Sequence, residues 1–251
     1  MSYNIFKKTA VCGLAILISA CSSLQLGTQT EEALSAKEKL YHSVKNYNGL
    51  ISLYRDALKK NDEPELRYKL ANSYYQAGDS QSSLLYLKPL LTRQDKIGEN
   101  ALLLEVKNNI QLSQYKDAMK NINVLLQRIP NNGEAYNLRG IIFAQEGNLQ
   151  EAFKDITRAR ELFINDVIAI NNLAMLSIIN GDYKNASSLL LPQYLNGSRD
   201  YRVMHNLVFA LVKSGEVDYA LDIIKKERLN TNPEDLVNAL KKTERLPKVS
   251  K

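Results

Sequence analysis

The sequence predicts an all-α protein, folded as a right-handed α-solenoid of about six helix–turn–helix repeats with a C-terminal capping helix. The first observation is a period, because one turn residue recurs at spacings of 35, 34, 34 and 34 residues: Gly78, Ser113, Gly147, Gly181 and Gly215. The second is a short side chain seven residues before each turn residue: Ala71, Val106, Gly140, Ala174 and Val208. The third is another short side chain five residues after it: Ser83, Ala118, Ala152, Ala186 and Ala220. A fixed period of this length is typical of stacked repeats, and short side chains let two antiparallel helices approach closely.

Residues 1–20 are predicted to be a lipoprotein signal peptide. The pair Lys7-Lys8 precedes an apolar stretch, Thr9–Ile18, that is too short to span a bilayer. The junction that follows, Ile18-Ser19-Ala20-Cys21, resembles the lipobox of bacterial lipoproteins, in which the cysteine is acylated and the peptide before it is removed. That resemblance implies lipidation of Cys21. An ordinary signal peptide with a chance cysteine, or a short buried helix, is the alternative interpretation.

Lipidation of Cys21 would attach the chain to a membrane. One acyl chain gives only marginal binding, whereas two or more anchor a protein stably. Ser22 follows the cysteine, and the lack of Asp there resembles lipoproteins that are sorted to the outer membrane. We therefore expect a lipid-anchored protein on the periplasmic side of the outer membrane. Residues 21–32 hold few apolar side chains and are predicted to be a lipidated tether. Because Cys12 leaves with the signal peptide, no disulfide is expected.

Residues 33–232 are predicted to form the repeat array. Glycine at the turn lets the chain leave the first helix of each repeat with a positive φ. The segments 136–152 and 171–186 carry the turn and short-residue code most completely, and they resemble the tetratricopeptide repeat (TPR), a helix–turn–helix unit of 34 residues. A degenerate first copy covers about residues 31–62.

The chain also departs from the TPR pattern. It contains no Trp, Glu105 and Arg139 replace the usual Leu, and Ile164 stands where Pro is expected. These departures leave the packing of single repeats open, but not the repeat itself.

After the sixth repeat, the sequence predicts one further helix. Asn232-Pro233-Glu234 places Pro at the first helical position, where its missing N–H costs nothing. Residues 233–246 are therefore predicted to form a capping helix that covers the open apolar end of the array. Residues 247–251 are predicted to be a disordered tail.

The TPR resemblance implies a concave groove lined by the first helix of each repeat. Counting from the turn residues places these predicted partner-binding side chains on it: Tyr68, Asn72, Tyr75, Asn137, Ile141, Asn171, Met175, Ile178, His205 and Phe209. The N-terminal half is polar and aromatic, whereas the C-terminal half is apolar with Asn at its edge. An apolar groove suits an amphipathic helix or an extended peptide, whose backbone the asparagines, including Asn172, would bond.

Each part of this groove has a second interpretation. The apolar members, together with Val212, equally suit a core between neighbouring helices. His205 also suits a satisfied or solvated side chain, the more common role of a single histidine. Three cations could receive a partner carboxylate or could be solvated surface groups: Lys107, Arg139 and Arg202.

Composition argues against several functional classes. The chain has 33 Lys and Arg against 27 Asp and Glu; without the first 20 residues the net charge is 31 − 27 = +4, which is scattered rather than gathered into the basic stripe of a nucleic-acid binder. Two His and two Cys cannot form a closed Cys/His zinc site. We expect no cofactor, no metal, no nucleic-acid partner and no catalytic residue. The competing class is a hydrolase or binder of cell-wall glycan, which would need paired carboxylates on one face. The acidic pairs here lie at helix starts or in linkers: Glu31-Glu32, Asp62-Glu63 and Glu234-Asp235.

The lipobox, about six TPRs and the segments 70–79, 171–174 and 205–208 together resemble the TPR-containing outer-membrane lipoproteins of the tight-adherence (Tad/Flp) pilus assembly system, the TadD-type, pilotin-like family. This resemblance implies a non-enzymatic adaptor that binds and helps localise or assemble an outer-membrane secretin or other pilus-assembly proteins, supporting pilus biogenesis and adherence. Two alternatives remain open. One is a pilotin-like lipoprotein of type IV pili, and the other is a TPR lipoprotein adaptor for peptidoglycan hydrolases or barrel assembly.

Overall fold

The computed structural model describes residues 34–244, and every regular element within them is helical. The chain divides into two compact units, the first ending at Leu87 and the second beginning at Lys88. Residues 34–232 of the predicted repeat array and residues 233–244 of the predicted capping helix fall within the described residues. The signal peptide, Cys21, the tether and the predicted tail at 247–251 lie outside them.

The first unit contains two antiparallel helix pairs. Residues 34–43 form its first helix, and three more follow: α2 (Tyr47–Lys60), α3 (Pro64–Gln76) and α4 (Ser80–Leu87). Its core is made by Leu50, Tyr54 and Leu70, all nearly inaccessible to solvent. The degenerate first repeat expected from the sequence is therefore a helical pair of the same kind as the others.

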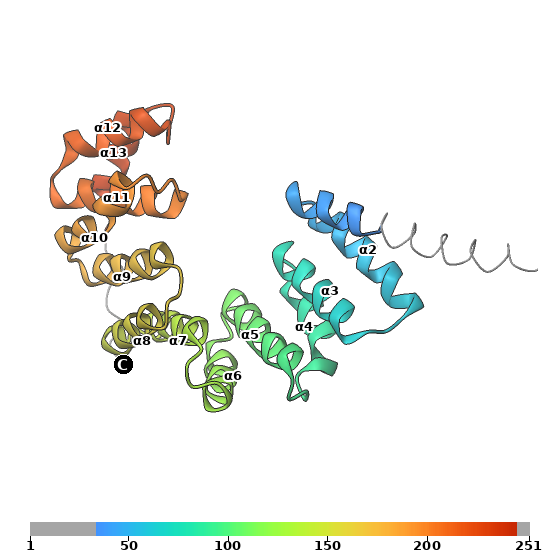
Figure 1. The fold of residues 1–251 in the computed structure, drawn as a ribbon. Coiled ribbons are helices and arrows are strands. Elements are labelled where there is room, and N and C mark those ends of the chain that lie inside the picture. Colours follow the sequence, from blue (N-terminus) through green and yellow to red (C-terminus); the bar gives the residue numbers. More distant parts are fainter. Residues whose placement is uncertain (1–33, 245–251) are drawn as a thin grey trace, which may run out of the picture. The chain divides into compact units, whose positions relative to one another are not determined.

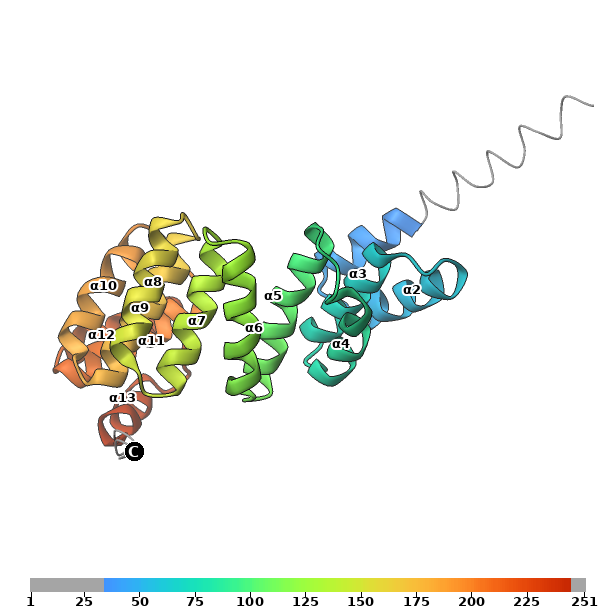
Figure 2. The same ribbon diagram turned by 90° about the horizontal axis from the view of Figure 1, so that it is seen from below.

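The second unit is a succession of helix pairs followed by one extra helix (Figures 1 and 2). A short 3₁₀ helix, η1 (Lys88–Leu90), precedes four pairs and the final helix: α5 (Lys96–Gln111), α6 (Tyr115–Arg128), α7 (Gly133–Gln145), α8 (Leu149–Glu161), α9 (Asp166–Asn180), α10 (Tyr183–Leu195), α11 (Tyr201–Ser214), α12 (Val217–Glu227) and α13 (Pro233–Lys242). Each helix packs against the next along the chain.

Side-chain caps start several of these helices. Asn132 accepts a hydrogen bond from the backbone N–H of Ala135 at 3.0 Å, and Asp182 accepts one from Asn185 at 3.1 Å. Such caps satisfy N–H groups that have no partner inside the helix, and each contributes about 1 kcal/mol. These caps help to fix where α7 and α10 begin.

The predicted turn residues adopt the predicted conformation. Gly78, Gly147, Gly181 and Gly215 have φ between 80° and 96°, and Ser113 has φ of 58°. At Gly181 the left-handed residue ends α9, and its N–H bonds the carbonyl of Ile178. This bond satisfies a carbonyl at the end of the helix, which is the physical reason for a left-handed residue there.

Replacing Gly181 with Val should therefore destabilise the second unit. A β-branched side chain in the left-handed region costs roughly 1–2 kcal/mol, and because each repeat contacts only its neighbours, the damage should broaden or split the unfolding transition. Thermal unfolding followed by circular dichroism measures the effect. Lys184→Val, on the exposed surface of α10, is the control and should change the melting temperature little. An unchanged single transition in Gly181→Val would contradict the assignment.

The two short-residue positions bring the helices of each repeat together. All ten residues at these positions are buried. At Gly140 on α7, a Cβ would lie 2.6 Å from Cγ1 of Ile156 on α8 and 3.1 Å from the carbonyl oxygen of Ala152. Any larger side chain would push these helices apart, so the close packing predicted from the sequence is confirmed.

The final helix α13 covers the end of the second unit. It packs against both α11 and α12, with Val237 buried and Leu236 and Leu240 packed on the same cluster. Lys213 of α11 donates hydrogen bonds to the carbonyl oxygens of Lys241 and Thr243, at 3.4 and 2.7 Å. The helix ends at Lys242, four residues before the end of the predicted capping segment.

Candidate interaction surface

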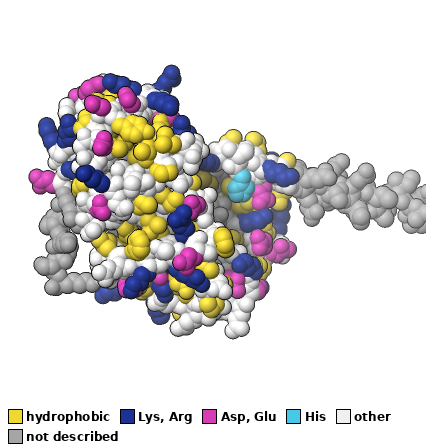
Figure 3. All heavy atoms as spheres, turned by 60° about the vertical axis from the view of Figure 1, so that its left-hand side comes forward, with side chains coloured by type: hydrophobic (Ala, Val, Ile, Leu, Met, Phe, Trp, Pro, Cys, Tyr) yellow, Lys and Arg dark blue, Asp and Glu magenta, His cyan; other side chains and the backbone are white. Residues whose placement is uncertain are grey.

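The first helices of neighbouring repeats contact one another in the second unit, α5 with α7, α7 with α9, and α9 with α11. The residue six positions before each turn residue occupies the same register on each of them, and all are partly exposed: Lys107, Ile141, Met175 and Phe209. We call Ile141, Met175, Ile178 and Phe209 the apolar row. On the face shown in Figure 3, hydrophobic side chains likewise gather in a band among charged ones.

Part of the apolar row packs against the core of the second unit. Ile141 packs on the buried cluster between α5, α6 and α7, and Ile178 packs on the cluster of α10 and α11. The Phe209 ring meets Tyr183 edge-on, with ring centroids 6.0 Å apart. Ile141 and Ile178 therefore have one side on the core, and all four side chains of the apolar row are partly exposed. Val212, by contrast, is buried in the cluster itself and belongs to the core.

The asparagines at the edge of the groove have an internal role. Asn172 donates a hydrogen bond to the side-chain oxygen of Asn137 at 2.7 Å, and Asn206 donates one to Asn171 at 2.9 Å. Asn137 and Asn171 are only 7% and 6% exposed. These pairs join the first helices of consecutive repeats and so give the asparagines a role in repeat stacking; that they also bond the backbone of a partner stays a prediction. Each pair is 35 residues apart, a recurrence that could have identified them in the sequence.

The three cations that could have received a partner carboxylate already bind carboxylates of the chain. Lys107 on α5 lies 2.6 Å from Glu134 at the start of α7, and Arg202 pairs with Asp200 at 2.8 Å. Hydrogen bonds from these groups satisfy their charges within the fold. Lys107, the polar residue in the register of the apolar row, is therefore held in an ion pair within the fold.

Arg139 explains one departure from the TPR pattern. Its guanidinium donates two hydrogen bonds to Asp155 on α8, at 2.6 and 2.9 Å, and a third to Asn123 on α6, at 3.2 Å. The hydrogen bonds to Asp155 raise the pKa of Arg139 above its ordinary value. A bidentate arginine thus links three helices at a position where Leu is usual, which the sequence alone did not show.

The predicted groove residues of the first unit, Tyr68, Asn72 and Tyr75, are partly exposed on α3. His205 of the second unit is exposed, with its ring 6.1 Å from that of Tyr201. The predicted groove residues thus fall in both units: Tyr68, Asn72 and Tyr75 belong to the first, and the apolar row belongs to the second.

The first unit contains a cluster of hydrogen-bonded polar side chains that was not expected from the sequence. The buried hydroxyl of Tyr54 donates to Glu38 at 2.7 Å, and Lys69 donates to the same carboxylate at 2.9 Å. Burial and then the bond to Glu38 raise the pKa of Tyr54. Burial acts to raise the pKa of Glu38, but the hydrogen bonds from Lys69 and Tyr54 outweigh it, so that pKa is lowered. The cluster ties the helix at 34–43 to α2 and α3.

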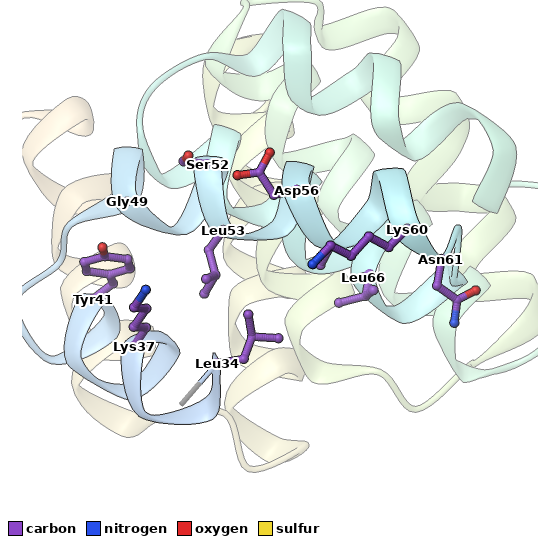
Figure 4. Close-up of a pocket in the computed structure, with 11 residues that line it drawn as sticks. Leu34, Lys37, Tyr41, Gly49, Ser52, Leu53, Asp56, Lys60, Asn61 and Leu66 are labelled. Atoms are coloured by element: carbon purple, nitrogen blue, oxygen red, sulfur yellow. The ribbon is translucent and has the colours of Figure 1, made fainter. Parts of the chain in front are cut away.

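The first unit also has an open depression of about 570 Å³ (Figure 4). Leu34 and Lys37 come from the helix at 34–43, Leu53 and Lys60 from α2, and Leu66 from α3. Tyr68, Asn72 and Tyr75 are not among its lining residues. Its lining mixes leucines with lysines and brings no cluster of reactive groups together.

Between residues 34 and 244, no group of His, Cys, Asp and Glu is arranged to hold a metal ion. Over the same stretch, none of the helices combines the length and apolarity needed to cross a membrane.

Comparisons with solved structures identify the fold. No family model and no curated protein matches the chain. A thermophilic TPR protein of Thermus thermophilus is 20% identical, with 72% of this chain and 98% of that one covered and a TM-score of 0.63. A tetratricopeptide repeat protein from Parabacteroides merdae is 19% identical, with 85% and 86% covered and a TM-score of 0.62.

A third solved structure is a chain of the APC/C hetero-tetramer Cut9–Hcn1. It is 13% identical, with 82% of this chain and 41% of that chain covered and a TM-score of 0.68. At such identities the likeness concerns the fold alone. The fold class expected from the 34-residue period is confirmed: the chain is an all-α protein with the TPR solenoid fold.

Proposed function

We propose that this chain is a lipid-anchored TPR adaptor that holds a segment of an outer-membrane secretin of a Tad/Flp-type pilus export machine. In this role it would help the secretin to localise or assemble, as a pilotin does. The chain would bind its partner without catalysing a reaction, and that partner would be a protein rather than a cofactor or a nucleic acid.

The observation that carries the proposal is the apolar row. Ile141, Met175 and Phe209 occupy one register on α7, α9 and α11, and all three are partly exposed; Ile141 packs on the core and Phe209 meets the ring of Tyr183. Spaced apolar side chains on a surface of successive helices suit the apolar face of an amphipathic helix or the alternate side chains of an extended peptide. An adaptor of this kind binds through shape and apolar contact, which requires no reactive group.

The lipobox-like junction at Cys21 supports the membrane half of the proposal. An acylated Cys21 would keep the adaptor at the inner face of the outer membrane, where a secretin must insert. The resemblance of the segments 70–79, 171–174 and 205–208 to the Tad/Flp lipoproteins supports the choice of partner.

Capture of the secretin tests the proposal. The full acylated chain, extracted in detergent from cells that also produce the secretin of the same organism, should co-purify with it. A parallel capture with the Cys21→Ser chain in detergent separates binding from anchoring, because the groove is unchanged. Recovery of a peptidoglycan hydrolase or a barrel-assembly protein instead of the secretin would contradict the choice of partner, and recovery of none of them would contradict the adaptor role.

A further inference from the structure

The turn between α8 and α9 displays a phenylalanine in an unfavourable setting. Phe163 is 95% exposed and has φ of 61°. A bulky residue in the left-handed region is strained, and an exposed Phe leaves a large apolar surface in water. The turn itself does not need this side chain, because its hydrogen bonds are made by backbone groups, such as the N–H of Phe163 with the carbonyl of Arg160 at 3.0 Å.

The next repeat shows what the turn would otherwise use. Gly197 stands at the corresponding place between α10 and α11, with φ of 91°. Glycine adopts this conformation without steric cost. Phe163 therefore combines backbone strain with exposed apolar surface at a position where glycine would avoid both. Such a conflict indicates that the side chain contacts something other than the rest of this chain.

Other exposed apolar side chains lie at the same kind of junction. Leu195 at the end of α10 and Tyr201 at the start of α11 are each 65% exposed, and Ile168 in the first turn of α9 is 37% exposed. Both junctions lead from the second helix of one repeat to the first helix of the next. We call Phe163, Ile168, Leu195 and Tyr201 the turn edge.

We propose that the turn edge contacts the surface of a phospholipid bilayer. Its side chains project from chain junctions instead of lining a cavity, which suits insertion between mobile headgroups. Tyr and Arg side chains place an apolar body in the headgroup region and keep a polar end in water; the Arg202 guanidinium lies 5.9 Å from the centre of the Tyr201 ring.

Charge at the turn edge favours zwitterionic lipid. Each arginine there is paired with a carboxylate: Arg160 with Asp166, Arg199 with Glu227 and Arg202 with Asp200. Because these arginines are neutralised within the fold, they add little long-range attraction to an anionic surface. Binding should therefore depend little on salt, because the long-range electrostatic attraction that salt screens is small.

This contact would orient the second unit on the bilayer, and it rests on the proposed lipid anchor for bringing the bilayer within reach. Single apolar insertions bind weakly by themselves. The effect of each residue is therefore best measured without any acyl chain.

The test uses the chain from residue 21 onward with Cys21→Ser, mixed with phosphatidylcholine vesicles and sedimented. The unsubstituted edge should bind, and Phe163→Gly should weaken partitioning about tenfold, the scale expected for burial of one large apolar side chain. Phe153→Ser is the matched control, because Phe153 is also an exposed phenylalanine, 55% accessible, but lies near the other end of α8. It should bind like the parent chain.

Phe163→Gly should melt at or above the parent temperature, since Gly fits the positive φ. The double variant Leu195→Ser, Tyr201→Ser tests the edge independently of that turn and should also bind more weakly. The inference is overturned if the parent chain stays in the supernatant, or if both variants sediment like it. It is also overturned if Phe163→Gly removes a self-association seen without vesicles and leaves vesicle binding intact. Secretin capture in detergent does not involve this edge, so either proposal can fail alone.

Discussion

Replacing Met175 with Glu should remove most of the proposed secretin binding while leaving the repeats folded. Met175 lies at the centre of the apolar row, between Ile141 and Phe209 in the neighbouring repeats, and is partly exposed in the free chain. A carboxylate there can remain hydrated until a partner covers it, and the bound state would then bury an unpaired charge. We expect affinity to fall by more than about 30-fold, the loss expected for removal of one central aromatic anchor.

Phe209→Ala tests the same surface by removing apolar area. Central aromatic anchors typically contribute about 2 kcal/mol or more, equivalent to roughly a 30-fold loss of affinity. Because Phe209 also meets Tyr183 edge-on, its removal should cost some stability. Helicity and melting temperature must therefore be measured beside affinity by titration calorimetry.

Two exposed positions on second helices serve as controls for the apolar row. Gln150→Glu on α8 adds the same charge as Met175→Glu, and Lys116→Glu on α6 changes the charge further; both residues are exposed. Neither should alter secretin binding. Folded Met175→Glu and Phe209→Ala chains that bind secretin like the parent would show that the partner occupies another surface.

Replacing Cys21 with Ser should release the protein from the outer membrane. The change removes the only thiol that the lipobox-like junction can acylate, and without acyl chains stable anchoring is lost. The helical fold of residues 34–244 should be unchanged, because the core described there contains no cysteine. Membrane fractionation after carbonate washing, with labelled palmitate, measures the effect.

Cys12→Ser is the matched control for the anchor. It changes the other cysteine of the chain, which lies within the predicted signal peptide. That variant should still incorporate palmitate and remain in the membrane fraction. Retention of the Cys21→Ser protein in carbonate-washed outer membranes would refute the lipoprotein interpretation.

The repeat could be predicted because its physical requirements are local. A left-handed residue is needed wherever a first helix ends, and Gly181 and Gly215 provide it at low cost. Gly140 must be small because α8 passes within van der Waals distance. Such demands recur every 34 residues, so the sequence shows them as a period without any knowledge of tertiary contacts.

The partner surface was predicted less completely, because exposure depends on residues in other repeats. Asn137 has the register of a groove residue, yet Asn172 of the next repeat bonds it and the two stack adjacent helices. Arg139 has the register of an apolar packing residue, yet Asp155 on α8 turns it into an ion pair. The register of a residue determines which face of the helix it occupies, but it does not determine which side chain of another helix lies against it.

The sequence by itself determined the helical class and the recurring turn and short-residue positions, since these follow from periodicity and from the conformational freedom of single residues. It placed Ile141, Met175 and Phe209 in one register but left open whether they are exposed or buried. Only the tertiary structure decided that Val212 belongs to the core, that Met175 stays partly open, and that Phe163 projects into solvent. The reason is that burial is a property of pairs of surfaces. A side chain is covered only when a neighbouring helix brings a complementary one against it, and the one-dimensional pattern does not contain that information.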